Sequence, residues 1–432
     1  MFDFSKQIDR HGTWCTQWDY VADRFGAADL LPFTISDMDF ATAPCILDAV
    51  SKRLGHGVFG YSRWKNDEFL GAVSHWFASR FHSPINREAI VYGPSVIYMV
   101  AEMIRQWSAV GDGIVVHTPA YDAFYKTIEG NQRRVAAVPL SLDNHHWRCD
   151  MAALERVLAQ PRNTVLLLCS PHNPTGKVWT REELETMAQL CEKHGVKVIS
   201  DEIHMDMVWD GQQHIPWCDV ARSPWALFTS GSKSFNIPAF TGAYGLIDDP
   251  AVRESYLHAL KSRDGLSSPS VPALVAHIAA YREGAPWLDA LRGYLQENMR
   301  FIAGELNQAF PELGWQPPQA TYLAWIDLRP LAVDDRALQK ALIEEQKVAI
   351  MPGYTYGEEG KGFVRLNAGC PREKLEKGVQ GLIAALRSLP DYFPFNNQVA
   401  GSPLPLAFIS PALCAVRTLS ANKIIVLSVP RR

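Results

Sequence analysis

Thr229-Ser-Gly-Ser-Lys-Ser-Phe-Asn236 places a lysine, Lys233, in a run of small and hydroxylic residues. The apolar segment Trp225-Ala-Leu-Phe228 precedes it and predicts a buried strand, so Lys233 would lie just past a strand's C-terminal end. A lysine in a tight, partly apolar place can lose its proton and become a nucleophilic amine. The serines beside it can offer hydroxyl and N–H groups to a phosphate. On its own the stretch is more typical of a solvated loop lysine, so the role of Lys233 must be judged from the rest of the chain.

Length and composition indicate an ordinary α/β globular protein. The chain has 432 residues, which is enough for two domains or one large unit. Its formal charge is −4, which gives no electrostatic reason to expect nucleic-acid binding. The N-terminus has no signal-peptide pattern, and no apolar run is long enough to span a membrane. Its 8 cysteines are scattered without metal-ligand spacing, which predicts reduced thiols in a cytoplasmic protein and no metal site.

Strand and helix patterns alternate through the first half of the chain. A helix is expected over residues 95–107, and Thr180-Arg-Glu-Glu183 is a capping box that starts another. Short apolar strands are predicted at residues 114–119, 164–169, 196–200, 225–229 and 242–247. This alternation predicts a mostly parallel sheet, in which ligands bind at the C-terminal strand ends. Four polar side chains fall just past separate strand ends and should converge there: Tyr121, Asn173, Asp201 and Lys233.

The turn Tyr92-Gly-Pro-Ser95 opens the first of these helices, with Ser95 as a plausible N-cap. A turn of this kind is a ready anion site, because free N–H groups and the helix dipole point the same way. It is also how many helices begin, so a phosphate site and a plain helix start both remain open for Ser95 and Val96.

Four segments differ in character. Residues 1–48 are expected to be an irregular, aromatic-rich arm that packs with a small domain. Residues 49–285 would form a large cofactor-binding domain, and residues 286–388 a smaller α+β domain. The tail, 389–432, has no charged residue from Tyr392 to Val416 and four prolines within that span, and it is expected to be poorly ordered.

Four motifs together resemble one known superfamily. They occur in the order typical of fold-type I pyridoxal 5′-phosphate (PLP) enzymes of the aminotransferase superfamily: Asn173-Pro-Thr-Gly176, Asp201 with a polar residue three positions on, Ser230-Gly-Ser-Lys233 and Arg365. Residues 1–388 further resemble a group of bacterial cystathionine β-lyases that also modulate the maltose regulon. That likeness is carried by residues 11–18, 33–40, 60–64, 201–206 and 351–357.

The resemblance implies a role for each residue of the cofactor site. Lys233 would bind PLP as a Schiff base and later move the substrate's Cα proton. Asp201 would pair with the pyridine nitrogen, Asn173 would hydrogen-bond the phenolic oxygen, and Tyr121 would stack on the ring. The phosphate would be held by Ser95, Val96, Ser230 and Ser232.

Other implied roles concern the substrate and the second subunit. Tyr61 would reach into the neighbouring site of a homodimer, and Arg365 would grip the carboxylate of an amino-acid substrate. Asp37 and Met38 would line the substrate entrance. Residue-level alternatives stay open: Ser232 as a loop residue, and Asp37 and Met38 as packing residues of the arm.

Two departures from the aminotransferase pattern favour a lyase. Aminotransferases of this type have Tyr where this chain has His204, and often Arg where it has Thr241. His204 is therefore interpreted as a structural histidine near the cofactor. The expected reaction is β-elimination, which would convert cystathionine to homocysteine, pyruvate and ammonia. The alternatives are an aminotransferase on the same scaffold, and a regulatory protein that binds MalT, the activator of the maltose regulon, with or without catalysis.

Overall fold

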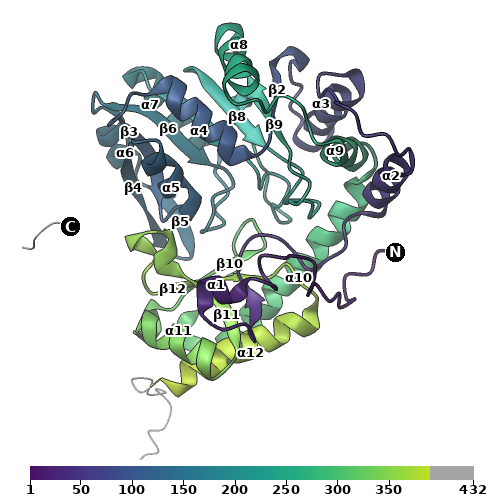
Figure 1. Cartoon of the computed structure of the whole chain (residues 1–432). Helices are drawn as coiled ribbons and strands as arrows, with labels where there is room; N and C mark the ends of the chain where they lie inside the picture. The colour runs from purple at the N-terminus through teal and green to yellow at the C-terminus, as the bar shows by residue number, and fades with distance from the viewer. Residues whose placement is uncertain (390–432) are drawn as a thin grey trace, which may run out of the picture. The chain divides into compact units, whose positions relative to one another are not determined.

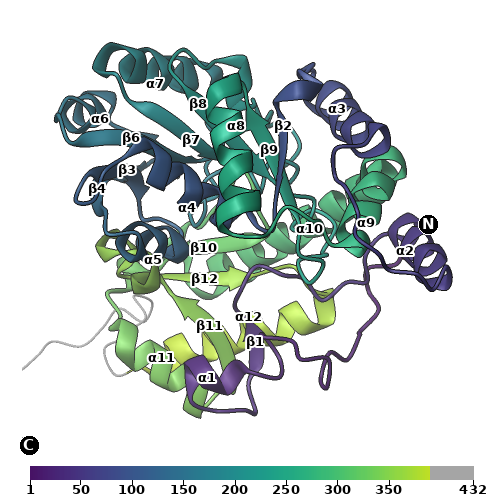
Figure 2. The same cartoon turned by 45° about the horizontal axis from the view of Figure 1, so that its top comes forward.

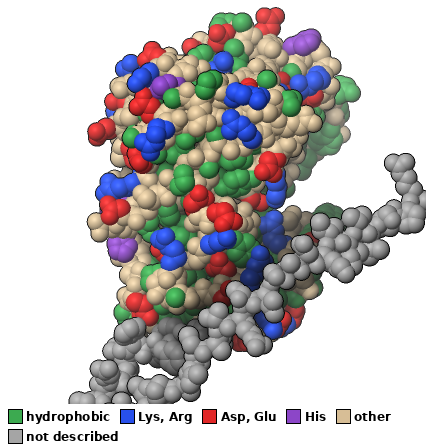
Figure 3. Space-filling model, turned by 90° about the vertical axis from the view of Figure 1, so that its left-hand side faces the viewer, with side chains coloured by type: hydrophobic (Ala, Val, Ile, Leu, Met, Phe, Trp, Pro, Cys, Tyr) green, Lys and Arg blue, Asp and Glu red, His purple; other side chains and the backbone are tan. Residues whose placement is uncertain are grey.

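Residues 1–389 are described by the computed structural model of the 432-residue chain. The tail predicted for residues 389–432 therefore lies, from residue 390 onward, outside the described residues. Within the described part, no helix is both long and apolar enough to cross a membrane. Figure 3 shows one face of the protein, on which basic and acidic side chains are interspersed rather than gathered into patches of one sign.

An eight-stranded, mostly parallel sheet forms the larger half of the fold, as predicted (Figure 1). Its strands run in the order β2-β9-β8-β7-β6-β3-β4-β5, and the five from β8 to β4 are mutually parallel. The bounds are β2 Ile90–Gly93, β9 Ala243–Ile247, β8 Trp225–Thr229, β7 Lys197–Asp201, β6 Asn163–Cys169, β3 Gly113–Thr118, β4 Arg134–Asp143 and β5 His146–Cys149. The central strands are buried along most of their length, which explains their continuous apolar sequences.

Helices cover both faces of this sheet, and a group of them lies beside its β2–β9 edge (Figures 1 and 2). Their bounds are α2 Pro44–Gly55, α3 Asp67–Phe81, α4 Val96–Trp107, α5 Asp122–Gly130, α6 Met151–Leu158, α7 Arg181–His194, α8 Pro250–His258 and α9 Val271–Glu283. The capping box predicted at Thr180 and Glu183 starts α7, with both reciprocal hydrogen bonds present. Ser95 caps α4 as predicted, because its hydroxyl accepts the N–H of Tyr98 at 3.1 Å.

A four-stranded sheet in the order β1-β11-β12-β10 forms the smaller half (Figure 2). Its strands are β1 Leu31–Phe33, β11 Val348–Pro352, β12 Phe363–Asn367 and β10 Leu323–Asp327. It is accompanied by α10 Ala285–Ala309, α11 Asp335–Glu344 and α12 Arg372–Ser388. The short N-terminal strand β1 pairs in parallel with β11, more than three hundred residues later in the chain.

The expectation of an irregular segment over residues 1–48 was wrong in part. This segment contains α1 Val21–Phe25, strand β1 and the start of α2. Strand β1 is only three residues long and contains a proline, so local sequence gives no alternating pattern to reveal it. Apart from β1, the strands of the two sheets fall on either side of the expected boundary near residue 286, but the domain limits themselves remain a prediction.

A close approach between α12 and β1 gives a stability prediction. Gly378 lies in α12 against the ring of Phe33, and a Cβ added there would overlap that ring. Gly378→Ala should therefore lower the free energy of unfolding by about 1–3 kcal/mol, measured by urea denaturation. Gly304 in α10 is the matched control, because a Cβ there meets nothing within 4 Å. Gly304→Ala should raise the same quantity by about 0.5–1 kcal/mol. Equal effects of the two substitutions would contradict the close packing of α12 on Phe33.

Candidate functional site

Four neighbouring strands carry the predicted polar residues to one cavity. Tyr121 follows β3, Asn173 follows β6, Asp201 ends β7 and Lys233 follows β8. All four line a cavity of about 200 Å³, together with Ser95, Val96, His204, Ser230 and Ser232. The structure thus brings together nine of the residues proposed from the sequence. Because β8, β7, β6 and β3 are adjacent and parallel, their C-terminal ends must meet at one edge.

One end of the cavity is suited to an anion. Ser95, Val96 and Ile97 begin α4 there, and the first N–H groups of a helix lack partners within the helix. The Ser230 hydroxyl is already engaged, since it donates to the carbonyl of Gly242 at 2.8 Å and accepts the N–H of Ser232 at 3.1 Å. The Ser232 hydroxyl has no partner among the described residues, so it is the freer of the two serines.

Lys233 is half-buried beside the N-terminal arm. Its Nζ donates to the backbone carbonyl of Ser36 at 3.0 Å. Burial lowers the pKa of Lys233 below its usual value, and Arg365 adds to this effect, whereas Asp37 and Asp201 oppose it. A depressed pKa favours the neutral amine, which is the form that acts as a nucleophile or a base.

Asp201 is buried with few groups to balance its charge. Its Oδ1 accepts the N–H of Ile203 at 3.1 Å, and its Oδ2 has no partner within residues 1–389. Burial raises the pKa of Asp201 to about 7, although the Ile203 N–H and Lys233 act in the opposite direction. A buried carboxyl group with a free oxygen facing a cavity is poised to bind a cationic or N–H group of a ligand.

Arg365 approaches the cavity through Asn173. Its Nη1 donates to Asn173 Oδ1 at 3.0 Å, and its Nη2 donates to the carbonyl of Thr34 at 3.1 Å. The guanidinium lies 4.7 Å from the ring centroid of Tyr356 and is buried. No carboxylate pairs with it in the described chain, so it is available to a carboxylate from a ligand.

His204 and Tyr121 complete the lining. Burial lowers the pKa of His204 to about 3, so the imidazole is neutral at physiological pH. Its Nδ1 is buried with no partner among the described residues. Burial raises the pKa of Tyr121 to about 12, so its phenol stays protonated. Tyr121 packs edge-to-face on Phe124 at 5.7 Å between centroids.

Four predicted residues do not line the cavity: Arg365, which contacts it through Asn173, and three residues that lie elsewhere. Tyr61 is fully exposed in the loop between α2 and α3 and makes no contribution to this cavity within its own chain. Asp37 forms an ion pair with Arg10 at 2.7 Å and does not line the cavity. The Met38 side chain is buried, and its backbone N–H donates to Asn236 Oδ1 at 2.9 Å. The roles assigned to these residues remain predictions.

The cavity-lining residue of the arm is Ser36, which sequence reasoning missed. Its carbonyl accepts the hydroxyl of Tyr322 at 2.9 Å as well as Lys233 Nζ. A backbone acceptor leaves no trace in side-chain identity, so no motif could have revealed it. Asp206 was also missed: its carboxylate accepts Ser234 Oγ at 2.7 Å and Trp76 Nε1 at 2.9 Å, which anchors the residue next to Lys233. Its position five residues after Asp201 was the available signal.

Comparisons with known proteins show what the chain is similar to. The family model for aminotransferase class I and II matches residues 28–382. Protein MalY of Escherichia coli K12 is 72% identical over 389 residues, covering 90% of this chain and all of that protein. Cystathionine beta-lyase PatB of Bacillus subtilis 168 is 35% identical, covering 89% of this chain and all of that protein. Among solved structures, cystalysin of Treponema denticola, which contains PLP, superposes with a TM-score of 0.84 at 28% identity, covering 90% and 99% of the two chains.

The raised pKa of Asp201 predicts a pH-dependent stability of the cofactor-free protein. A carboxyl whose folded pKa, about 7, exceeds its unfolded value of 3.8 stabilises the fold below that unfolded value and loses this contribution as pH rises through 7. As pH rises from 5 to 8, the unfolding free energy of the cofactor-free native protein should therefore fall by about 2–3 kcal/mol more than that of Asp201→Asn. Urea denaturation at the two pH values measures it.

The exposed Asp248→Asn serves as the control, because it makes the same chemical change at a carboxyl group that is not buried. The interpretation fails if both variants show the same pH dependence.

Proposed function

The chain belongs to the aminotransferase class I and II family, and we propose that it is a PLP-dependent β-lyase that cleaves the C–S bond of cystathionine. The observation that carries the proposal is the convergence of Lys233, Asp201 and the N-terminus of α4 on one cavity. The overall reaction consumes cystathionine and water and yields homocysteine, pyruvate and ammonia. Identity of 72% to MalY and of 35% to a cystathionine β-lyase supports it.

The residues present fit PLP. The Oδ2 of Asp201 and the Ser232 hydroxyl have no hydrogen-bond partner among the described residues, and a pyridinium N–H and a phosphate would satisfy them. We assign Lys233 to the covalent link, Asp201 to the pyridine nitrogen, Asn173 to the phenolic oxygen and Tyr121 to the ring face. The phosphate would lie at the start of α4, with Ser95, Val96, Ser230 and Ser232. When bound, PLP withdraws electrons from the substrate's Cα and so makes the Cα–H bond acidic.

Side chains of the protein have separate roles in the reaction. Arg365, which lacks a carboxylate partner among the described residues, holds the substrate carboxylate and so orients Cα. Lys233, whose pKa is lowered by burial, accepts the Cα proton as a neutral amine. The C–S bond at Cβ then breaks, and the thiolate leaves with its electron pair. Burial lowers the pKa of His204 to about 3, so we assign it no acid role toward that thiolate; its ring packs edge-on against Tyr322 at 6.4 Å between centroids.

Transamination on the same scaffold is the less supported alternative. His204 and Thr241 both line the cavity at the positions where aminotransferases have Tyr and often Arg. MalY and the cystathionine β-lyase PatB, at 72% and 35% identity, are more similar to this chain than the aspartate aminotransferase of Geobacillus stearothermophilus, at 24%. A lyase releases pyruvate without an added 2-oxo acid, whereas an aminotransferase requires one.

Replacing the lysine gives the direct test. Lys233→Ala should lower pyruvate release from cystathionine by at least about a thousandfold, because both the covalent link and the base are lost. Pyruvate is measured with a coupled dehydrogenase, and homocysteine with a thiol reagent. Lys340→Ala, an exposed lysine of α11, is the control and should retain full activity. Amino transfer to an added 2-oxo acid with no pyruvate release would instead establish the aminotransferase.

Further parts of the proposal concern assembly and partners. We infer a homodimer in which the fully exposed Tyr61 reaches the neighbouring cavity, since no described residue of its own chain covers it. We also propose that the protein binds the maltose-regulon activator MalT, which rests on the resemblance to MalY. The reduced cysteines expected from the sequence support a cytoplasmic location; those in the described part of the chain are all free.

Regulation and catalysis should be separable. Lys233→Ala should bind purified MalT as tightly as the native protein does, because the lysine lies half-buried in the cavity and not on an exposed surface. Biolayer interferometry with immobilised MalT measures this. Absence of binding by the native protein would refute the regulatory role, and loss of binding only in the variant would show that MalT recognises the loaded site.

A further inference from the structure

A hollow of about 400 Å³, which we call the α1 hollow, adjoins the lysine cavity along the N-terminal arm. Its walls are α1 together with Thr16, Tyr20, Thr34 and Ile35. Ser36, the next residue, lines the lysine cavity. The carbonyl of Thr34 also accepts Arg365 Nη2 at 3.1 Å, so one wall of the hollow holds the group assigned to the substrate carboxylate. None of the roles proposed above uses this hollow.

Helix α1 is held in place on the small sheet. Val21 is buried in a cluster that includes a side chain of β11. Phe25 packs against a second cluster, which contains Met351 of the same strand. Asp23 and Arg24 lie between these two contacts in the sequence, and both line the α1 hollow. The helix therefore presents one acidic and one basic side chain to the hollow from a fixed position.

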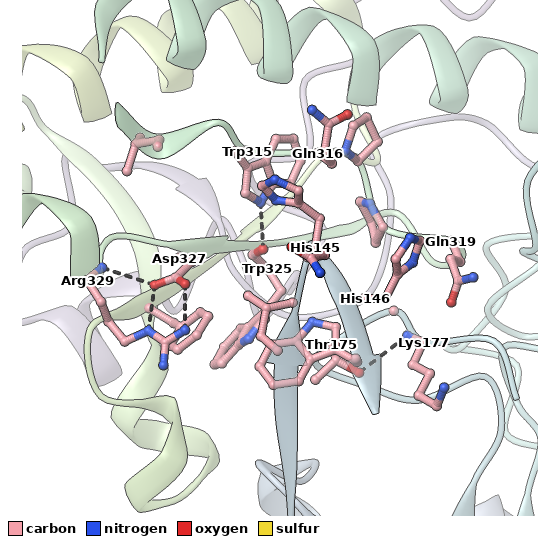
Figure 4. A pocket seen from close by; sticks show the side chains of 18 of the residues that line it. His145, His146, Thr175, Lys177, Trp315, Gln316, Gln319, Trp325, Asp327 and Arg329 are labelled. Atoms are coloured by element: carbon pink, nitrogen blue, oxygen red, sulfur yellow. Dashed lines mark hydrogen bonds and ion pairs between the residues drawn. The ribbon is translucent and has the colours of Figure 1, made fainter. Parts of the chain in front are cut away.

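These two charged side chains are exposed, and neither is in an ion pair within residues 1–389. Arg24 Nη1 donates to Met351 Sδ at 3.3 Å, which is a weak acceptor. The larger cavity of about 610 Å³ in Figure 4 differs, because Arg329 there pairs with Asp327 at 2.6 Å. A guanidinium and a carboxylate that are both unpaired at one hollow suit a ligand that carries a carboxylate and an ammonium group.

Arg24 and Arg365 approach the same face of the small sheet. Met351, which Arg24 contacts, and Arg365 are directly paired residues of β11 and β12, and such pairs present their side chains on one face. Both arginines also lie near the phenol of Tyr356. Burial raises the pKa of this phenol, and Arg365 and Arg24 are each close enough to oppose the rise. One wall therefore carries two guanidinium groups, one at the lysine cavity and one at the α1 hollow.

The spacing of these groups suits a substrate that is an amino acid at both ends. In extended cystathionine the two carboxyl carbons lie about 8 Å apart, at about 1.2 Å per bond. Directly paired residues of antiparallel strands have Cα atoms about 5 Å apart, and Arg24 lies one further contact beyond Met351. A substrate with one carboxylate on Arg365 can therefore bring its second carboxylate to Arg24.

We propose that the α1 hollow binds the distal amino-acid half of cystathionine, which leaves as homocysteine. Arg24 pairs with the carboxylate of this half, and Asp23 pairs with its ammonium group. The inference rests on the lyase function proposed above, because it concerns the part of that substrate beyond the sulfur. The hollow thus selects cystathionine over S-alkylcysteines, which lack both charged groups.

Three substrates with the same carbon chain test this selection on the full-length, PLP-loaded protein. They are cystathionine, S-(3-carboxypropyl)-L-cysteine, which lacks the distal ammonium group, and S-propyl-L-cysteine, which lacks both distal charges. Pyruvate release gives kcat/KM for each. The native protein should prefer cystathionine over S-propyl-L-cysteine at least about tenfold, with the carboxypropyl compound between them.

Variants assign the two charges separately. Arg24→Met removes the guanidinium and should lower the preference for cystathionine over S-propyl-L-cysteine about three- to tenfold. Asp23→Asn should lower the preference for cystathionine over the carboxypropyl compound, which has no ammonium group to lose. Arg300→Met, an exposed arginine of α10 paired with Glu297, is the control and should leave every preference unchanged.

The outcomes distinguish the distal subsite from the lyase itself. No pyruvate from any of the three substrates would refute the lyase and this inference with it. Pyruvate release with preferences that Arg24→Met leaves unchanged would overturn the distal subsite while the lyase stands. An equal loss of kcat/KM for all three substrates in Arg24→Met would also overturn it, because the residue would then act on the fold rather than on the distal half.

Discussion

The carbonyl oxygen of Ser36 accepts two hydrogen bonds, from Lys233 Nζ at 3.0 Å and from the Tyr322 hydroxyl at 2.9 Å. Lys233 follows a strand of the large sheet, Tyr322 precedes a strand of the small sheet, and Ser36 belongs to the N-terminal arm. Asn367 and Asn236 extend this junction by donating to the carbonyls of Ile35 and Met38. The geometry around the lysine therefore depends on three separate parts of the chain meeting at one backbone atom.

The same region concentrates charge that is poorly compensated. Asp201 and Arg365 are buried with no opposite charge in direct contact among residues 1–389, and Lys233 is half-buried with its Nζ on a neutral carbonyl. The raised pKa of Asp201 and the lowered pKa of Lys233 reflect the free-energy cost of holding these groups away from water. In a nearby structural ion pair each buried charge is matched instead, because Lys374 Nζ lies 2.6 Å from Asp39 Oδ2. Buried charged side chains without a neighbouring opposite charge, gathered at one edge of a sheet, are typical of a ligand site.

Side-chain pattern was sufficient to predict the central parallel strands, the α4 and α7 helix starts, and the convergence of Tyr121, Asn173, Asp201 and Lys233. These features follow from local apolar runs, from capping chemistry and from the geometry of parallel sheets. Strand β1 could not be predicted, because its pairing with β11 depends on residues more than three hundred positions away. The hairpin of β4 and β5 is local, but its turn, Asn144-His145, lacks the glycine that usually marks such a turn. The role of Ser36 was likewise invisible, since it is carried by the backbone.

The pairing of β1 with β11 has a consequence for how the protein is made. Leu31–Phe33 leaves the ribosome early, yet its partner Val348–Pro352 is synthesised more than three hundred residues later. Throughout that interval the edge of β1 lacks its partner β11, and the carboxylate of Asp39 lacks Lys374, although Arg10 and Trp18 can already pair with it. Contacts this distant in sequence close slowly and after local ones. The large sheet can form during synthesis, whereas the setting of the lysine is completed only when the chain is nearly finished.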